Sequence, residues 1–198
     1  MRLTTLPPAV LDVVLNACET EPVLLNSERI QRRFGSYDIR VLPSEPGLRR
    51  SSLYSIDDDG PVCRTYAVVR FADQPHDGYS EEHAKVLAGN SIGAIFRSHG
   101  WDIHKQTSYI GRLLPPVRST QIGQLMQISD RRKLALHVYQ LLLARNDQVF
   151  EYATIVETHH PEYLSESDVL ELYEYDESTG LSPVAVSDLA RLVFHVAK

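Results

Sequence analysis

A carboxylate at the end of an apolar segment is the residue best placed for chemistry in this sequence. Glu157 follows Ile155 and Val156 in the run VFEYATIVE, whose composition is typical of a strand. Burial there would raise the pKa of the carboxyl group, whereas a position at the strand end would leave the group in water. The sequence leaves both interpretations open.

Two adjacent histidines, His159 and His160, follow Glu157 and raise the question of a metal site. Successive side chains of a strand point to opposite faces, so neighbouring histidines cannot easily bind one ion. The other histidines lack the HxH and HExxH spacings, and Cys18 and Cys63 form no CxxC pair. We therefore expect no metal ion.

The run PVCRTYAVVRF also predicts a strand, with two faces of different character. Alternation places Arg64 and Tyr66 on one face, toward solvent or a lined cavity. The other face is apolar, and we expect it to meet the core.

A helix is expected to begin after Asn90 and Ser91, and its free backbone N–H groups at Ile92 and Gly93 could hold a carboxylate. No dinucleotide fingerprint, phosphate-binding loop or GxSxG motif occurs. Nucleotide binding and serine hydrolysis therefore have no support.

Composition predicts one globular domain spanning residues 1–198. The 198 residues are 43% hydrophobic and 23% charged, and the net charge of -6 argues against a general nucleic-acid binder. The N-terminal apolar run is too short to span a membrane, and Asp12 and Pro7-Pro8 do not suit a signal peptide. We expect a cytoplasmic protein without a membrane partner. One stretch is rich in arginine, and we interpret it as solvated surface: Arg29, Arg32, Arg33, Arg49 and Arg50.

The order of the expected elements predicts an α+β fold with an antiparallel sheet and flanking helices. Asp57–Gly60 and Arg145-Asn146-Asp147 each predict the turn of a hairpin. Strands are expected at 37–42, 49–56, 61–71, 101–114, 133–143 and 149–157, and a loop at 115–130. Helices are expected from Pro7, at 80–88 with Ser80 as its cap, at 91–98, after Ser165 with Asp168 in a capping box, and at 186–196.

Three segments, taken in order, resemble the chorismate pyruvate-lyase family and the related UTRA-like effector-binding domains of GntR-type regulators. RRSSLYSIDDDGPVCRTYAVVRF is similar to a family hairpin that turns through Asp-Gly-x-Pro, and LAGNSIGAIF is similar to its Leu-Gly-x-x-Pro-Leu-Gly helix start. VYQLLLARNDQVFEYATIVETHHPEYL resembles the closing hairpin, which ends in Glu-x-x-x-Pro, here Glu157 and Pro161. The resemblance covers residues 48–164 and implies a chorismate lyase-like fold.

In the lyases, pyruvate is eliminated from chorismate to leave 4-hydroxybenzoate, and no cofactor is required. The resemblance implies that Glu157 is catalytic and that the family's arginine position falls on Tyr66. Arg64, two residues earlier and about 6.5 Å away along the strand, would take the role of that arginine as the second catalytic residue. Tyr66, Arg112, Ile92 and Gly93 would bind the substrate.

Two functions follow from the resemblance, and a protein-interaction role on the same fold is a third. The first is an enzyme acting on chorismate or a related small carboxylate. The second is a non-catalytic domain that binds a small molecule. Convergence of Arg64 and Glu157 on one enclosed cavity would favour the enzyme. The segment before residue 48 is too short for a winged helix, so no nucleic-acid partner is expected, and residues 165–198 are expected to form a helical C-terminal extension. The sequence leaves the oligomeric state open.

Overall fold

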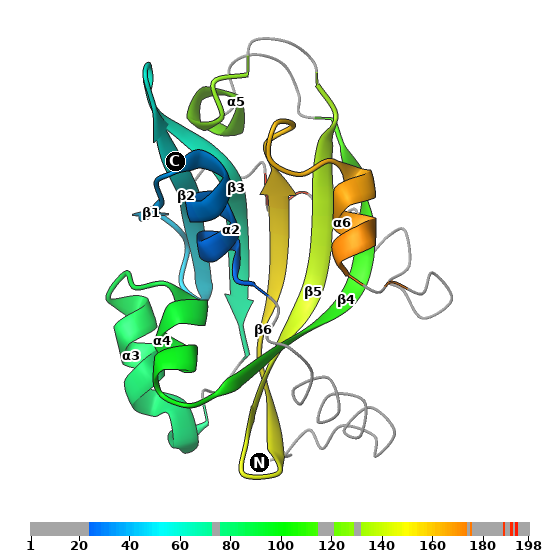
Figure 1. The fold of residues 1–198 in the computed structure, drawn as a ribbon. Coiled ribbons are helices and arrows are strands. Elements are labelled where there is room, and N and C mark those ends of the chain that lie inside the picture. The colour runs from blue at the N-terminus through cyan, green and yellow to red at the C-terminus, as the bar shows by residue number, and fades with distance from the viewer. Residues whose placement is uncertain are drawn as a thin grey trace.

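One six-stranded antiparallel sheet organises the chain (Figure 1). The computed structural model describes residues 24–72, 76–114, 121–128, 132–173, 175, 188, 191 and 193. The strand order is β1-β2-β3-β6-β5-β4, which confirms the expected α+β class. The strands are β1 Asp38–Leu42, β2 Leu48–Asp57, β3 Gly60–Phe71, β4 Asp102–Leu113, β5 Leu134–Arg145 and β6 Gln148–His159.

Local turn chemistry forms the two expected hairpins. Asn146 and Asp147 adopt left-handed backbone angles, φ 52° and 58°, between β5 and β6. Asn and Asp tolerate this conformation, which suits a two-residue hairpin turn. Asp57 pairs with Gly60 across the turn between β2 and β3, where Gly60 has φ 110°. The hairpins are joined in the middle of the sheet, where β3 pairs with β6.

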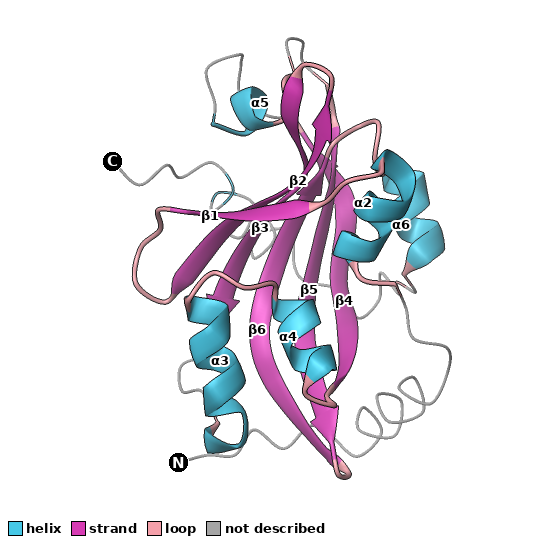
Figure 2. Ribbon diagram, turned by 60° about the vertical axis from the view of Figure 1, so that its left-hand side comes forward, coloured by secondary structure: helices cyan, strands magenta, loops and turns pink. Residues whose placement is uncertain are grey.

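Helices cover the two faces of the sheet unequally (Figure 2). The helices are α2 Asn26–Phe34, α3 Ser80–Leu87, α4 Ile92–Ser98, α5 Gln121–Leu125 and α6 Glu166–Leu172, with a 3-10 turn at Asp77–Tyr79. Apolar side chains of α2, α3, α4 and α6 pack against one face, which we call the helical face. Helix α5 packs against the opposite face. Of the described helices, none is long and apolar enough to cross a lipid bilayer.

Several helix predictions need correction. Helix α2 was not expected, and α5 lies in a segment expected to be a loop. Ser80 is the first residue of α3 rather than its cap, because Tyr79 occupies the N-cap position. The capping box of Ser165 and Asp168 is confirmed, with Asp168 N–H donating to Ser165 Oγ at 3.2 Å. The expected helix from Pro7 and the core of the expected helix at 186–196 lie outside the described residues.

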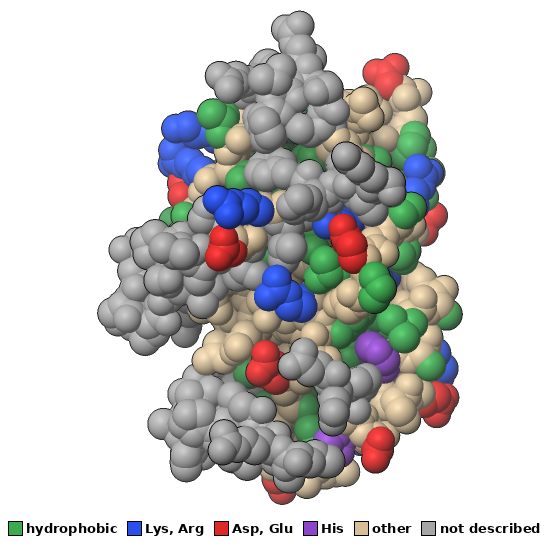
Figure 3. Space-filling model, turned by 180° about the vertical axis from the view of Figure 1, so that it is seen from behind, with side chains coloured by type: hydrophobic (Ala, Val, Ile, Leu, Met, Phe, Trp, Pro, Cys, Tyr) green, Lys and Arg blue, Asp and Glu red, His purple; other side chains and the backbone are tan. Residues whose placement is uncertain are grey.

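The arginine-rich stretch does not form one solvated surface. Arg49 and Arg50 are 4% and 1% exposed, on opposite faces of β2, whereas Arg32 and Arg33 are exposed on α2. Seen from behind, the described part of the surface mixes acidic and basic side chains (Figure 3). The interpretation of Arg49 and Arg50 as solvated was therefore wrong.

Phe96 is the natural probe of how the helical face is packed. Its ring is fully buried and contacts Tyr79, Trp101 and Tyr152, with centroids 6.0, 6.1 and 4.7 Å away. We expect Phe96→Ala to lower the free energy of unfolding by about 3–5 kcal/mol, because it leaves a cavity among these rings. Urea denaturation measures the loss. Leu87→Ala, at a side chain 61% exposed, should stay within about 0.5 kcal/mol of the wild type. Equal losses in the two variants would contradict this account of the core.

Candidate functional site

Paired residues on the helical face form the floor of a pocket. Ala67 on β3 pairs with Glu157 on β6, and Glu157 pairs with His137 on β5. Residues paired across antiparallel strands point to the same face, so these side chains meet above the sheet. The next row along the sheet is Arg49, Val69, Ile155 and Tyr139.

Helices α2 and α4 and strand β4 complete the walls of the pocket. The cavity volume is about 90 Å³. Half of the lining side chains are apolar, namely Leu25, Ile39, Leu53, Ala67, Val69, Ile92, Ile103, Leu141 and Ile155. The other lining residues are Asn26, Ser27, Arg49, Ser51, Ser91, Gly93, Lys105, Tyr139 and Glu157. Apolar walls with a few polar groups are typical of small-molecule sites.

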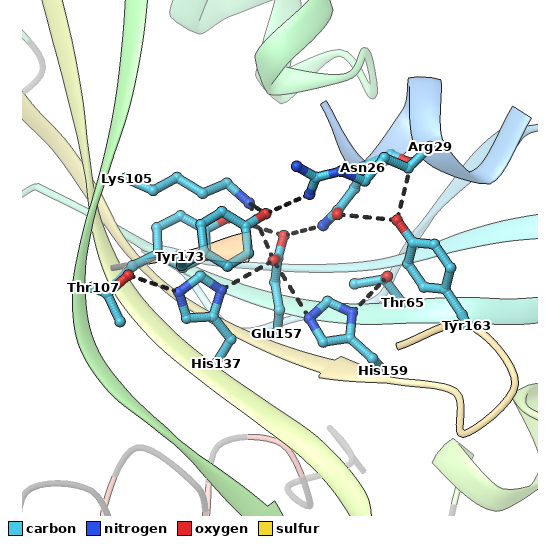
Figure 4. A network of polar contacts seen from close by, with 11 residues as sticks. Asn26, Arg29, Thr65, Lys105, Thr107, His137, Glu157, His159, Tyr163 and Tyr173 are labelled. Carbon is cyan, nitrogen blue, oxygen red and sulfur yellow. Dashed lines mark hydrogen bonds and ion pairs between the residues drawn. The ribbon is translucent and has the colours of Figure 1, made fainter. Parts of the chain in front are cut away.

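Glu157 is buried and closely surrounded by donors (Figure 4). Its Oε1 accepts hydrogen bonds from Asn26 Nδ2 and Tyr139 OH, both at 2.9 Å, and Lys105 Nζ lies 3.3 Å from Oε2. Burial alone would raise the pKa of this carboxyl group. The charge of Lys105, the two nearby histidines and the Tyr139 hydrogen bond outweigh burial and lower the pKa to about 2. Both earlier interpretations therefore need correction: Glu157 is buried, yet it stays ionised.

Lys105 is held in a cage of aromatic rings. Its ammonium lies 4.3 Å from the ring centre of Tyr139 and 5.1 Å from that of Tyr173, and it donates to Tyr173 OH at 3.3 Å. Arg29 on α2 also donates to Tyr173 OH, at 2.9 Å. Burial would lower the pKa of Lys105, but Glu157 and Tyr173 reverse this and raise it. Lys105 and Glu157 thus form an ion pair in which the carboxylate is buried and the lysine side chain is 18% exposed.

Two histidines lie beside this ion pair, one on each side of Glu157. His137 and His159 are fully buried, and their rings contact the hydroxyl groups of Thr107, at 3.2 Å, and Thr65, at 3.0 Å. The other ring nitrogens, His137 Nδ1 and His159 Nε2, each lie 3.9 Å from Glu157 Oε2 and have no hydrogen-bond partner. Burial lowers both pKa values, that of His159 to about 4, so both rings are neutral near pH 7.

Arg49 brings a buried positive charge to the other side of the pocket. Its guanidinium donates to the carbonyl groups of Val86 at 3.1 Å and Gly89 at 3.4 Å, while its Nε has no hydrogen-bond partner. Among the described residues, no carboxylate lies within ion-pair distance of it. Burial lowers the pKa of Arg49.

Three of the six predicted site residues line this pocket. Glu157 is on its floor, and Ile92 and Gly93 contribute from the first turn of α4. A Cβ at position 93 would lie 2.7 Å from Leu25 Cδ2, so a larger residue there would require the Leu25 side chain to shift.

Arg64 does not line the pocket, and β3 bulges at this residue. Leu53 pairs with Thr65 and Tyr54 pairs with Cys63, so Arg64 is an extra residue in the strand. Its guanidinium stacks on the ring of Phe34 in α2, 3.9 Å from the ring centre. It also forms ion pairs with Asp57 and Glu162. The expected convergence of Arg64 and Glu157 does not occur.

Tyr66 and Arg112 also lie outside the pocket. Tyr66 is on the opposite face of the sheet, in the core beside α5, where Arg50 Nη1 is 3.5 Å from its hydroxyl. Arg112 is 59% exposed at the side chain and pairs with Glu166 of α6. The expected placement of Arg64 and Tyr66 on one face was wrong, because a bulge shifts the alternation of side chains.

Sequence reasoning missed most of the groups that surround Glu157. Asn26 lies on a helix that was not expected, and Lys105 and Tyr139 belong to segments that were predicted only as strands. A weak signal existed for His137, which interrupts the apolar run KLALHVYQLLL. Its proximity to Glu157 depends on the register of β5 against β6, which could not be predicted from the sequence.

Because the two buried histidines have lowered pKa values, we expect the protein to lose stability in mild acid. An unfolded histidine binds a proton below about pH 6.5, whereas folded His159 resists protonation down to about pH 4. The free energy of unfolding should therefore fall as pH decreases through this window. In His159→Gln the slope should be shallower, by up to about 1.4 kcal/mol per pH unit.

Urea denaturation at a series of pH values measures this slope. His104→Gln is the matched control, because His104 lies on the opposite face of β4 from Lys105. Equal slopes in wild type and His159→Gln would contradict the assignment.

No protein-family model and no curated protein matches this chain. Among solved structures, a GntR-family transcriptional regulator from Enterococcus faecalis V583 is similar, with 10% identity and a TM-score of 0.32 over 66% of this chain and 93% of that one. The C-terminal domain of Yurk from Bacillus subtilis subsp. subtilis str. 168 has 16% identity and a TM-score of 0.32 over 65% of this chain and 89% of that one.

Proposed function

We propose that this protein is a non-catalytic binding domain for a small molecule that carries an anionic group. Arg49 supplies the observation on which the proposal depends. Burying a guanidinium without a carboxylate partner costs free energy, because no nearby negative charge offsets its desolvation. An anionic group of a ligand would offset this cost and would accept a hydrogen bond from the unpaired Nε.

The chemistry of arginine favours a carboxylate or a phosphate as that anionic group. Its planar guanidinium has five N–H donors, and two of them bond to Val86 and Gly89. The remaining donors suit an acceptor with two oxygens. Ser51 and Ser91 line the same pocket and offer hydroxyl groups.

The rest of the pocket suggests the shape of the ligand. Arg49 is on β2 and Glu157 is on β6, with β3 between them and an offset of two residues along the strands, which separates their Cα atoms by roughly 12 Å. Apolar side chains cover the floor between them. A ligand with an anion at one end, an apolar body and a hydroxyl group at the other end would match this arrangement, since Glu157 can accept a hydrogen bond.

The protonation states favour binding over acid–base catalysis. An efficient proton-transfer group has a pKa near the working pH. Here the pKa of Glu157 is lowered to about 2, that of Lys105 is raised, and that of Tyr139 is raised well above its usual value by burial and by Glu157. The resemblance of the sequence to effector-binding domains of regulators agrees with this choice.

Arg49→Met tests the proposal, with 4-hydroxybenzoate as the probe and 4-hydroxybenzamide as its neutral counterpart. Wild type should bind the acid more tightly than the amide, because only the acid carries a negative charge that can pair with the Arg49 guanidinium. Loss of a charged hydrogen bond costs about 1.5–3 kcal/mol, so Arg49→Met should weaken binding of the acid roughly ten- to hundred-fold. Isothermal titration calorimetry measures the affinities.

Arg70→Met is the matched control, because Arg70 is exposed on β3. This variant should bind the acid with the same affinity as the wild type. Equal affinity for acid and amide, or an unchanged affinity in Arg49→Met, would refute the role of Arg49. Release of pyruvate from chorismate, lost in Glu157→Ala, would instead establish the lyase and refute a purely binding role.

A further inference from the structure

Three potential metal ligands converge above the centre of the sheet. They are His137 on β5, Glu157 on β6 and His159 two residues further along β6, and their ligand atoms lie within 4.8 Å of one another. Residues two apart on a strand share a face, and His137 is the cross-strand partner of Glu157. The register of the sheet therefore produces the cluster.

We propose that His137 Nδ1, Glu157 Oε2 and His159 Nε2 form a binding site for a divalent transition-metal ion of the Zn²⁺ type. Two imidazoles and one carboxylate are a donor set that zinc accepts, with its remaining position open to water or a ligand. Glu157 lines the pocket and the two histidines do not, so the ion would lie beside the cavity.

The unsatisfied ring nitrogens are the observation that points to an ion. His137 and His159 are fully buried, yet one nitrogen of each ring has no hydrogen-bond partner and faces the carboxylate. Buried polar atoms in native proteins are nearly always satisfied. A metal ion between the three side chains would satisfy both nitrogens at once.

The threonines beside the histidines occupy the positions of outer-shell partners. Thr107 Oγ1 lies 3.2 Å from His137 Nε2, and Thr65 Oγ1 lies 3.0 Å from His159 Nδ1. A hydroxyl that accepts the N–H of one ring nitrogen leaves the lone pair of the other free for a metal. Metal-binding histidines are commonly oriented in this way.

The spacing of the cluster requires only small movements to bind an ion. Ligands of tetrahedral zinc, each about 2.0–2.1 Å from the ion, lie roughly 3.4 Å apart. The two nitrogen–oxygen distances here are 3.9 Å. These two pairs would close by about half an ångström, and the two histidine nitrogens, which lie within 4.8 Å of each other, by up to about 1.4 Å.

Lys105 is the competitor for this site. Its ammonium lies 3.3 Å from Glu157 Oε2, the same oxygen that would bind the metal. It also contacts Tyr173 OH at 3.3 Å, so it has a second acceptor when a metal occupies the carboxylate. Removing this positive charge should therefore strengthen metal binding.

Titration of the full chain, free of any affinity tag, with Zn²⁺ alone tests the proposal. Wild type should bind one ion, and Co²⁺ in its place should give the visible absorption of a low-coordinate site with nitrogen and oxygen ligands. His137→Ala and His159→Ala should each lose this saturable binding. Mg²⁺ should not bind, because it prefers an all-oxygen set of ligands.

Further variants separate a metal site from a merely structural role of the histidines. His160→Ala should bind zinc as the wild type does, because the Nδ1 of His160 instead accepts the N–H of Glu162 at 3.1 Å. Thr65→Val, of nearly the same shape, should bind zinc about ten- to hundred-fold more weakly. Lys105→Met should bind zinc more tightly than the wild type, and zinc should raise its Tm by a larger amount.

Three results would overturn the proposal. They are the absence of zinc binding by wild type, binding that survives in both His137→Ala and His159→Ala, and binding by Lys105→Met alone. The site does not rest on the proposed function, because zinc is titrated without an organic ligand. Arg49→Met should bind zinc normally even where it fails to bind 4-hydroxybenzoate, so the two proposals can fail separately.

Discussion

The largely buried ion pair between Lys105 and Glu157 is the interaction on which the arrangement of the site depends. Removing two charges from water is expensive, and their attraction offsets the cost only when further hydrogen bonds complete the pair. Here Asn26 and Tyr139 saturate one carboxylate oxygen, and the rings of Tyr139 and Tyr173 surround the ammonium. The pair therefore ties β4, β5 and β6 to α2 and to the end of α6. Each of these elements is positioned partly by what the ion pair requires.

The parts of the fold that follow from local chemistry could be predicted from the sequence. The hairpin at Asn146-Asp147 is one example, because the turn residues themselves adopt the left-handed backbone. The capping box of Ser165 and Asp168 is another. Helix α2 could not be predicted in this way, because it is short, rich in charge and buries only Asn26 and Ile30. Its position is decided by contacts with distant residues, such as Asn26 with Glu157.

The site was only partly predictable, and for a related reason. Glu157 and the start of α4 were identified from local sequence, and the structure brings them to one pocket. Arg64 was misplaced by a single-residue bulge, which no composition signal marked. Arg49 was read as surface because most arginines are exposed, although it is almost fully buried. Two histidines face Glu157, namely His159 and His137 of the neighbouring strand, whereas His160 does not. Pairing between strands decides which side chains meet.

The pairing of β3 with β6 also has a consequence for how the chain folds. It brings Thr65 into contact with His159, which is 94 residues further along the sequence. Contacts of such long range slow folding, because closing the long intervening loop costs conformational entropy. Neither hairpin contains the complete cavity, so ligand affinity should arise late, as the two halves dock. A fragment that holds only one of the hairpins would lack part of the binding site.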